Sequence, residues 1–176
     1  GSINLMDTMV DMRSKLGDLD QATQTATIAQ IFGKESVSAW ASIINASDKD
    51  FTKLVENIYM SDGATRKLNE SAKLSGTTLE EMQASMSIVN ATFEEGTFDA
   101  DGLALALGAM AKAGYTGKEA GDALADGLSA LSMPVKSVQE AMAKYGVEVV
   151  KNSDGSLNLK GTIEELRTEL GGLDED

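Results

Sequence analysis

The chain has 176 residues, of which 42% are hydrophobic and 5% aromatic, and its formal net charge is −13. A chain of this length forms one domain or two small ones and can bury a core unaided. The negative charge disfavours nucleic acid and anionic membranes, because binding either needs clustered lysine and arginine. The absence of cysteine and histidine excludes disulfides, Cys/His zinc sites, and thiol or Ser-His-Asp catalysis within this chain. No apolar run approaches the roughly 18 residues of a membrane span.

Helical periodicity, capping residues and glycine stops predict five short helices in the first half of the chain. The predicted helices span residues 5–16, 20 or 21 to 32, 35–45, 50–60 and 64–74. Asn4 is the expected N-cap of the first helix, and either Ser47 or Asp48 caps the fourth. Trp40, the single tryptophan, is expected in the core.

The second half is predicted to continue as helices and then to change to strands. Helices are expected over 79–93, over 103–113, from Thr116 to Pro134 and from Ser137 to Gly146. Thr116 and Ser137 each stand three residues before a glutamate, which is the spacing of a capping box. β-branched valines, a Ser-Asp-Gly turn and alternating leucines then predict a β-hairpin over 147–159. The expected fold is mainly α: a compact bundle of short helices with one small β-hairpin near 147–159.

Small residues and methionines predict how these helices pack. The glycines inside predicted helices are Gly102, Gly108, Gly121 and Gly127. Each costs about 1 kcal/mol relative to alanine, so they indicate close helix contact or local weakness. Helix 103–113 is apolar nearly all round, which predicts that it is buried. The methionines expected to fill the core are Met82, Met86, Met110, Met133 and Met142.

No motif brings together the residues of a catalytic, cofactor-binding or metal site. The turn at Asp154 resembles a calcium loop but lacks its full ligand spacing, so a hairpin turn explains it better. The G-x-x-x-G spacing over 117–121 suits an anion at a helix start, but it lacks the context of a phosphate loop and favours close helix packing. Paired carboxylates such as Glu80 and Glu81 are adjacent on a helix and do not converge on one site. We therefore predict no enzymatic activity, no cofactor and no metal.

The chain repeats its first predicted helix near its end, because residues 4–20 match residues 158–174 at a constant offset. The identical pairs are Asn4/Asn158, Leu5/Leu159, Thr8/Thr162, Arg13/Arg167, Leu16/Leu170, Gly17/Gly171, Leu19/Leu173 and Asp20/Asp174. A natural tandem array or an engineered permutation would produce this repeat. A chance match between two short amphipathic helices is the remaining explanation.

The order of these signals resembles the conserved core of phage tail tape-measure proteins. Between Phe98 and Asp176 the shared signals are a helix, Ala-Gly-Tyr-Thr-Gly at 113–117, Ser-Met-Pro at 132–134, Gly-Val-Glu-Val at 146–149, Asp-Gly-Ser-Leu at 154–157 and a final helix over 163–170. In that family the last helix precedes a helix ending Ile-Phe-Gly and another apolar helix. Here these features stand at the opposite end, in the region from Asn4 to about Ile58, with Ile-Phe-Gly at 31–33.

The resemblance implies a structural segment of a phage or prophage tail tape-measure protein. Such a segment would act in tail assembly and length determination, without enzymatic activity. It would lie in the tail lumen of the virion, after assembly in the bacterial cytoplasm. The implied partners are other copies of itself and tail-tube or tail-assembly proteins, with no small-molecule substrate, no direct nucleic-acid binding and no membrane span in this segment.

In terms of that family the chain divides into two half-modules. Residues 3–75 resemble the back half of a tape-measure-like repeat, and residues 76–176 resemble the front half of the next, which includes the hairpin. The two halves are expected to pack as one domain. The alternative function is a soluble helical protein-binding module with no viral role, which would hold a partner peptide in a groove between the small-residue helices.

Overall fold

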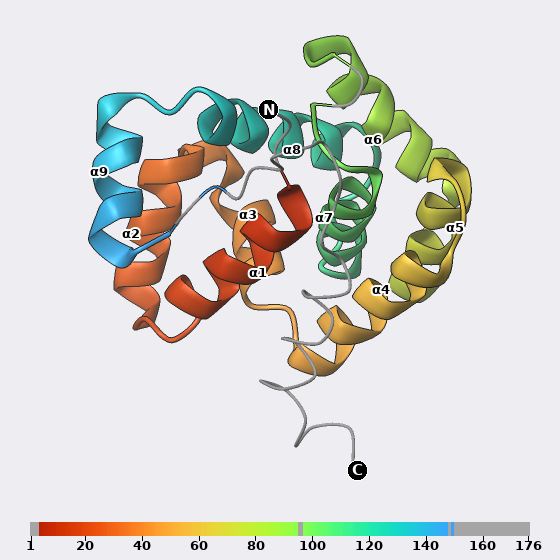
Figure 1. The fold of residues 1–176 in the computed structure, drawn as a ribbon, viewed down its shortest axis with the longest axis horizontal. Helices are drawn as coiled ribbons and strands as arrows, with labels where there is room; N and C mark the ends of the chain where they lie inside the picture. The colour runs from red at the N-terminus through yellow and green to blue at the C-terminus, as the bar shows by residue number, and fades with distance from the viewer. Residues whose placement is uncertain (1–3, 95–96, 148, 150–176) are drawn as a thin grey trace.

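The computed structural model describes residues 4–94, 97–147 and 149 (Figure 1). Within these residues the elements are α1 (Leu5–Leu16), α2 (Gln21–Phe32), the 3-10 helix η1 (Lys34–Ser36), α3 (Val37–Ile44), α4 (Asp48–Met60), α5 (Ala64–Ser75), α6 (Leu79–Thr92), α7 (Ala100–Lys112), α8 (Gly117–Ser132) and α9 (Lys136–Tyr145). The mainly α fold and the order of short helices predicted from the sequence are confirmed.

Side-chain caps begin five of the described helices, namely α1, α2, α4, α6 and α7. In each case a side-chain oxygen accepts a hydrogen bond from the backbone N–H three residues on, which satisfies a group that the helix itself leaves free. The capping residues are Asn4, Asp20, Ser47, Thr78 and Asp99. Ser47, and not Asp48, is therefore the N-cap of α4.

The two predicted capping boxes are wrong. Thr116 precedes α8 as its N-cap residue, but its side chain makes no capping hydrogen bond. Helix α9 begins one residue before Ser137, and its N-cap residue Val135 has no side chain that accepts. Both helices form without a cap because tertiary packing of an apolar face supplies most helix stability in a folded protein. In α8 that face includes Leu124, Leu128 and other fully buried residues.

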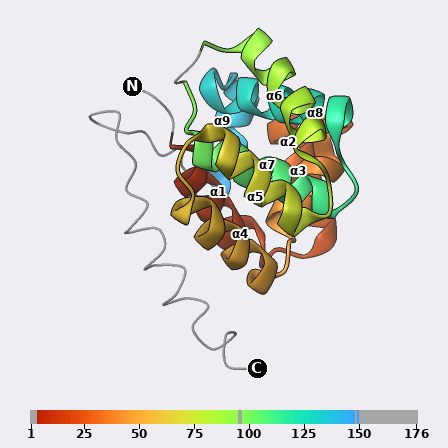
Figure 2. The ribbon, with the colours of Figure 1, turned by 90° about the vertical axis from the view of Figure 1, so that its right-hand side faces the viewer.

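Helix α7 lies at the centre of the fold, as its all-round apolar sequence predicts. Every residue from Asp101 to Met110 is buried. Helices α1, α3, α4, α5 and α8 all contact it (Figures 1 and 2). A helix surrounded in this way has no face left for solvent, which explains its lack of a polar side.

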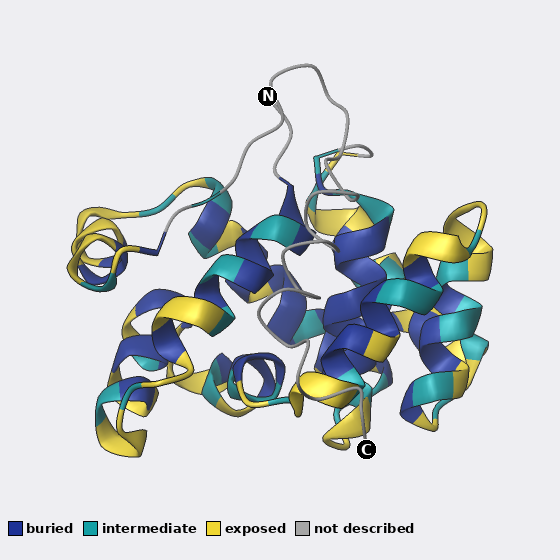
Figure 3. Cartoon of the chain, turned by 60° about the horizontal axis from the view of Figure 1, so that its bottom comes forward, coloured by how far each residue is buried: buried dark blue, intermediate teal, exposed yellow. Residues whose placement is uncertain are grey.

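The other helices pack against α7, against its neighbours or, for α9, against α2. Helices α4 and α5 pack side by side against one flank of α7, as Figure 2 shows. Helix α6 packs along α8, and α2 packs against α3, α8 and α9. Buried positions lie on the helix faces that meet each other, whereas exposed positions lie on outer faces and turns (Figure 3).

One cluster of buried apolar side chains includes residues from α1 through α9. Its largest fully buried members include Trp40 and Phe51, and the expected core position of Trp40 is confirmed. The division into half-modules over 3–75 and 76–176 remains a prediction, because much of the second range lies outside the described residues.

The β-hairpin predicted near 147–159 is not supported. Val147 and Val149 are the described residues of that stretch, and neither lies in a strand. The rest of the predicted hairpin lies outside the described residues. In the described part of the chain, no helix combines the length and apolar character needed to cross a membrane.

Candidate functional site

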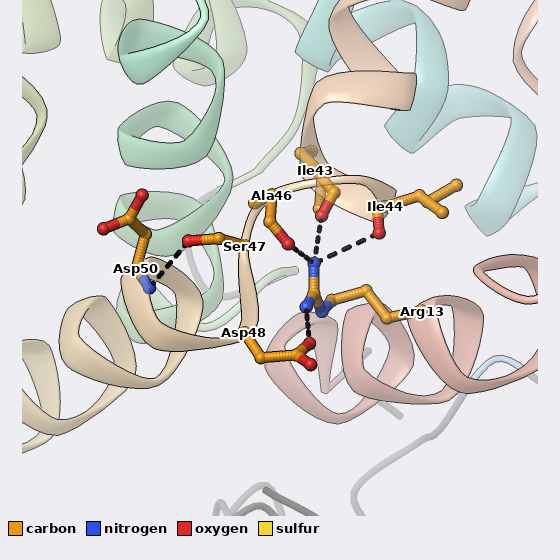
Figure 4. A network of polar contacts seen from close by, with 7 residues as sticks. All are labelled: Arg13, Ile43, Ile44, Ala46, Ser47, Asp48 and Asp50. Carbon is orange, nitrogen blue, oxygen red and sulfur yellow. Dashed lines mark hydrogen bonds and ion pairs between the residues drawn. The ribbon is translucent and has the colours of Figure 1, made fainter. Parts of the chain in front are cut away.

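The most elaborate polar contact centres on Arg13, whose side chain is only 10% exposed near the end of α1. Its Nη1 donates to the backbone carbonyls of Ile43 at 2.8 Å, Ile44 at 3.1 Å and Ala46 at 3.0 Å (Figure 4). These carbonyls belong to the end of α3 and the turn that follows, where a helix leaves its acceptors unpaired. Arg13 therefore caps the C-terminus of a neighbouring helix.

The same guanidinium also reaches α4. Its Nη2 lies 2.8 Å from Oδ1 of Asp48, the first residue of that helix, and its plane lies over the Phe51 ring at 4.0 Å. Burial lowers the pKa of Arg13 and the Asp48 carboxylate opposes this shift, but an arginine stays charged at any physiological pH. One side chain thus joins α1, α3 and α4. We call Arg13, Asp48 and the three carbonyls the Arg13 lock.

Asp99 joins the N-termini of α1 and α7. Its two carboxylate oxygens accept from the backbone N–H groups of Leu5 at 2.5 Å and Gly102 at 2.7 Å. Burial raises the pKa of Asp99, and the hydrogen bonds from these backbone groups oppose the rise. The carboxylate therefore accepts hydrogen bonds at the N-termini of both α1 and α7, which fixes where α1 meets the central helix.

A third polar contact joins α4, α5 and α7. Lys67 Nζ lies 2.6 Å from Asp101 Oδ1 and donates to the carbonyl of Ile58 at 2.9 Å. The side chains of Lys67 and Asp101 are 13% and 7% exposed. Each charge is matched and hydrogen bonded, as buried ions must be, so this pair holds helices together.

Glycines of α8 allow two helices to approach closely, as the sequence predicts. A Cβ added to Gly121 would lie 2.9 Å from the carbonyl oxygen of Ser85 in α6, and Ser85 Oγ donates to the carbonyl of Gly117 at 2.6 Å. A Cβ added to Gly127 would overlap the indole ring of Trp40. The predicted close packing at 117–121 is confirmed.

The acidic side chains and one surface hollow bear on ligand binding in the described part of the chain. The described residues contain no group of three or more acidic residues placed to hold a metal ion. A hollow beside Glu81, Tyr115 and Thr116 is open to solvent and too shallow to enclose a water molecule, whereas ligand pockets begin at roughly 300 Å³. Glu80 and Glu81 are exposed, as expected for a solvated face. The turn at Asp154 lies outside the described residues.

Sequence reasoning missed the contacts that now stand out. Arg13 and Lys67 lie within predicted helices and Asp99 lies just before one, and the local sequence does not indicate a partner on another helix. One signal was available for Arg13, since the repeat preserves it as Arg167. The prediction that Met133 fills the core is wrong, because it is 83% exposed in the turn after α8.

The fold and these contacts define an all-α protein whose buried polar groups connect helices. A family model described as phage-related minor tail protein matches residues 35–176, and the chain belongs to that family. It is therefore a phage tail protein, with a structural role in the tail and a place in the virion. No curated protein and no solved structure matches the chain.

Proposed function

We propose that this chain is a folded segment of a tail tape-measure protein, which contributes to tail assembly and to the setting of tail length. The observation that carries the proposal is the family match over residues 35–176, which covers most of the stretch whose ordered signals resemble tape-measure proteins. Among phage tail proteins, the tape-measure protein is the one whose ordered signals this chain resembles.

The geometry favours a compact module over an extended ruler. The longest described helix, α8, has 16 residues and is about 24 Å long. A ruler made of one continuous helix would instead gain about 1.5 Å for every residue, or on the order of 260 Å for a chain of this size. We therefore assign this segment to a folded part of the tape-measure protein.

The proposed partners are other copies of the chain and proteins of the tail tube or its assembly. Exposed apolar side chains offer contact points, and they include Met60 at 82%, Met133 at 83% and Val135 at 64%. The net charge of −13 supports a location beside DNA without binding it, because like charges repel. Neither a catalytic role nor a small-molecule substrate forms part of the proposal.

Two measurements on the phage test this function. Mass spectrometry of purified tails should detect peptides of this chain, and their absence would refute a place in the virion tail. Electron microscopy of phage with this segment deleted in frame should show a changed tail length, with a shortening well below 1.5 Å per deleted residue. Tails of unchanged length would leave the protein in the tail family but would refute the tape-measure role.

A further inference from the structure

Residues 158–174, which we call the α1-like segment, repeat α1 and the turn that follows it. Several of the repeated residues make hydrogen bonds that begin α1 or α2. Asn4 caps the helix by accepting from Asp7 N at 3.0 Å, and Thr8 Oγ1 donates to the Asn4 carbonyl at 2.8 Å. Asp20 then caps α2 by accepting from Thr23 N at 3.0 Å. The α1-like segment has the same residue types as Asn4, Thr8 and Asp20 at the same spacing.

The contacts that α1 makes with its surroundings are also preserved. Leu5 and Leu16 are fully buried, and both are leucine in the α1-like segment, at positions 159 and 170. Arg13, which forms the lock with α3 and α4, recurs as Arg167. The segment therefore carries the two leucines and the arginine that contact the surface left by removing α1, which we call the α1 socket. The socket consists of the facing surfaces of α3 and α7 with the turn between α3 and α4.

The two segments differ at nine positions. Met9, Asp11 and Met12 have the conservative replacements Ile163, Glu165 and Leu166, and Asp7 is replaced by Gly161. Ser14, Lys15 and Asp18 are exposed in the structure, so their replacement does not disturb the socket. Met6 and Val10 are buried, and they are replaced by Lys160 and Glu164. At these two positions a charged side chain stands where α1 has a buried apolar one, and burial of a charge is costly unless it is paired. The native α1 is therefore the stronger occupant.

The chain can bring the α1-like segment to its own socket. Gly146, where α9 ends, lies next to Lys15 of α1, because an added Cβ there would be 3.9 Å from Lys15 Nζ. Residues 148–157 span on the order of 33 Å when extended. Helix α1 has 12 residues and is about 18 Å long. Such a linker reaches the start of the socket and gives the segment a high effective concentration there.

We propose that residues 158–174 are a second occupant of the α1 socket, and that they fill the socket of their own chain whenever α1 leaves it. The surface between α3 and α7 would then bind either α1 or the α1-like segment through the residue types that the two share. Exchange between them would expose α1, while Leu159 and Leu170 would take the core positions of Leu5 and Leu16. The exchange concerns the isolated chain, so its test does not depend on a role in setting tail length.

The test is a pair of matched substitutions in the full chain, Leu16→Asp and Leu170→Asp, at equivalent positions with the same original residue. Urea unfolding followed by circular dichroism gives the ratio of folded to unfolded protein for each variant and for the double variant. Leu170→Asp alone should leave that ratio unchanged, because α1 fills the socket. Leu16→Asp alone should remain folded, because the α1-like segment replaces α1. In the Leu16→Asp background, Leu170→Asp should lower the ratio by about tenfold or more, since the two effects are coupled.

Controls separate exchange from a general effect on the chain. Thr168→Asp changes a position whose counterpart, Ser14, is exposed, and it should have no effect in the Leu16→Asp background. Leu5→Asp with Leu159→Asp repeats the cycle at the other end of the helix and should show the same coupling. Light scattering of the Leu16→Asp variant should give the monomer mass of 18.5 kDa.

Three results would overturn the proposal. The first is an additive double variant in either cycle. The second is unfolding of both single variants in α1, since the segment would then have failed to replace it. The third is a doubled mass for the Leu16→Asp variant, which would place the segment in the socket of a second copy instead of its own.

Discussion

Replacing Gly127 by alanine should destabilise the protein, although alanine favours a helix. Gly127 lies inside α8, and a Cβ there would overlap atoms Nε1, Cε2 and Cζ2 of the Trp40 ring. The ring has little freedom to move. It is fully buried, donates to the Ala123 carbonyl at 2.8 Å and stacks on Phe32 at 4.2 Å between ring centroids.

Three free-energy contributions decide whether Gly127→Ala stabilises or destabilises the protein. Alanine gains about 1 kcal/mol over glycine in a helix interior. Overpacking a dense core costs about 1–3 kcal/mol, and leaving the buried indole N–H unpaired costs about 1–3 kcal/mol more. We expect a net loss of about 2 kcal/mol in the free energy of unfolding, which lowers Tm by about 4–8 °C in a protein of this size.

The assay uses the single tryptophan of the chain, which lies at the perturbed site. Urea unfolding should be followed by Trp40 emission and, independently, by circular dichroism. The emission of folded Gly127→Ala should shift from that of the wild type, because the ring must move. Ser129→Ala is the matched control, since this exposed position lies on the same helix, and it should leave both stability and emission unchanged.

A double variant tests the cause directly. Phenylalanine lacks the overlapping ring atoms, so Gly127→Ala should cost at least about 1 kcal/mol less in a Trp40→Phe background than in the wild type. The reasoning is refuted if Gly127→Ala is as stable as the wild type and has the same emission. It is equally refuted if the cost is the same in both backgrounds.

Two further substitutions test the polar contacts. Arg13→Met should lower the free energy of unfolding by about 3 kcal/mol, because it removes the hydrogen-bond donor of buried backbone carbonyls. Lys15→Met, which removes an exposed ion pair on the same helix, should change it by less than about 0.5 kcal/mol, and equal losses in a denaturant titration would refute the lock. Burial raises the pKa of Asp99 in the folded state above its unfolded value. Folding is therefore favoured while Asp99 is protonated, and this contribution is lost as pH rises through the folded pKa. The stability of the wild type relative to Asp99→Asn should fall over that pH range in parallel unfolding titrations, and a difference independent of pH would contradict this.

The sequence by itself determined the class of fold and most helix limits. Apolar spacing and local caps depend on residues within one or two turns, so they can be read without any tertiary information. This is why α1, with its Asn4 cap, and the largely buried α7 follow from the sequence. The interior glycines also indicated close contact, although the sequence could not name Trp40 as the partner of Gly127.

Only the tertiary structure decided which residues meet across helices. Gln24 is buried and Ala26 is exposed in α2, the reverse of what their polarity predicts. The reason is that Gln24 donates to the Leu16 carbonyl at 3.0 Å and accepts from Asn45 at 2.8 Å, so its amide satisfies groups on two other elements. The burial of Arg13 has the same origin. A polar side chain is stable in the core only when its partners are already in place, and the packing of distant segments alone supplies those partners.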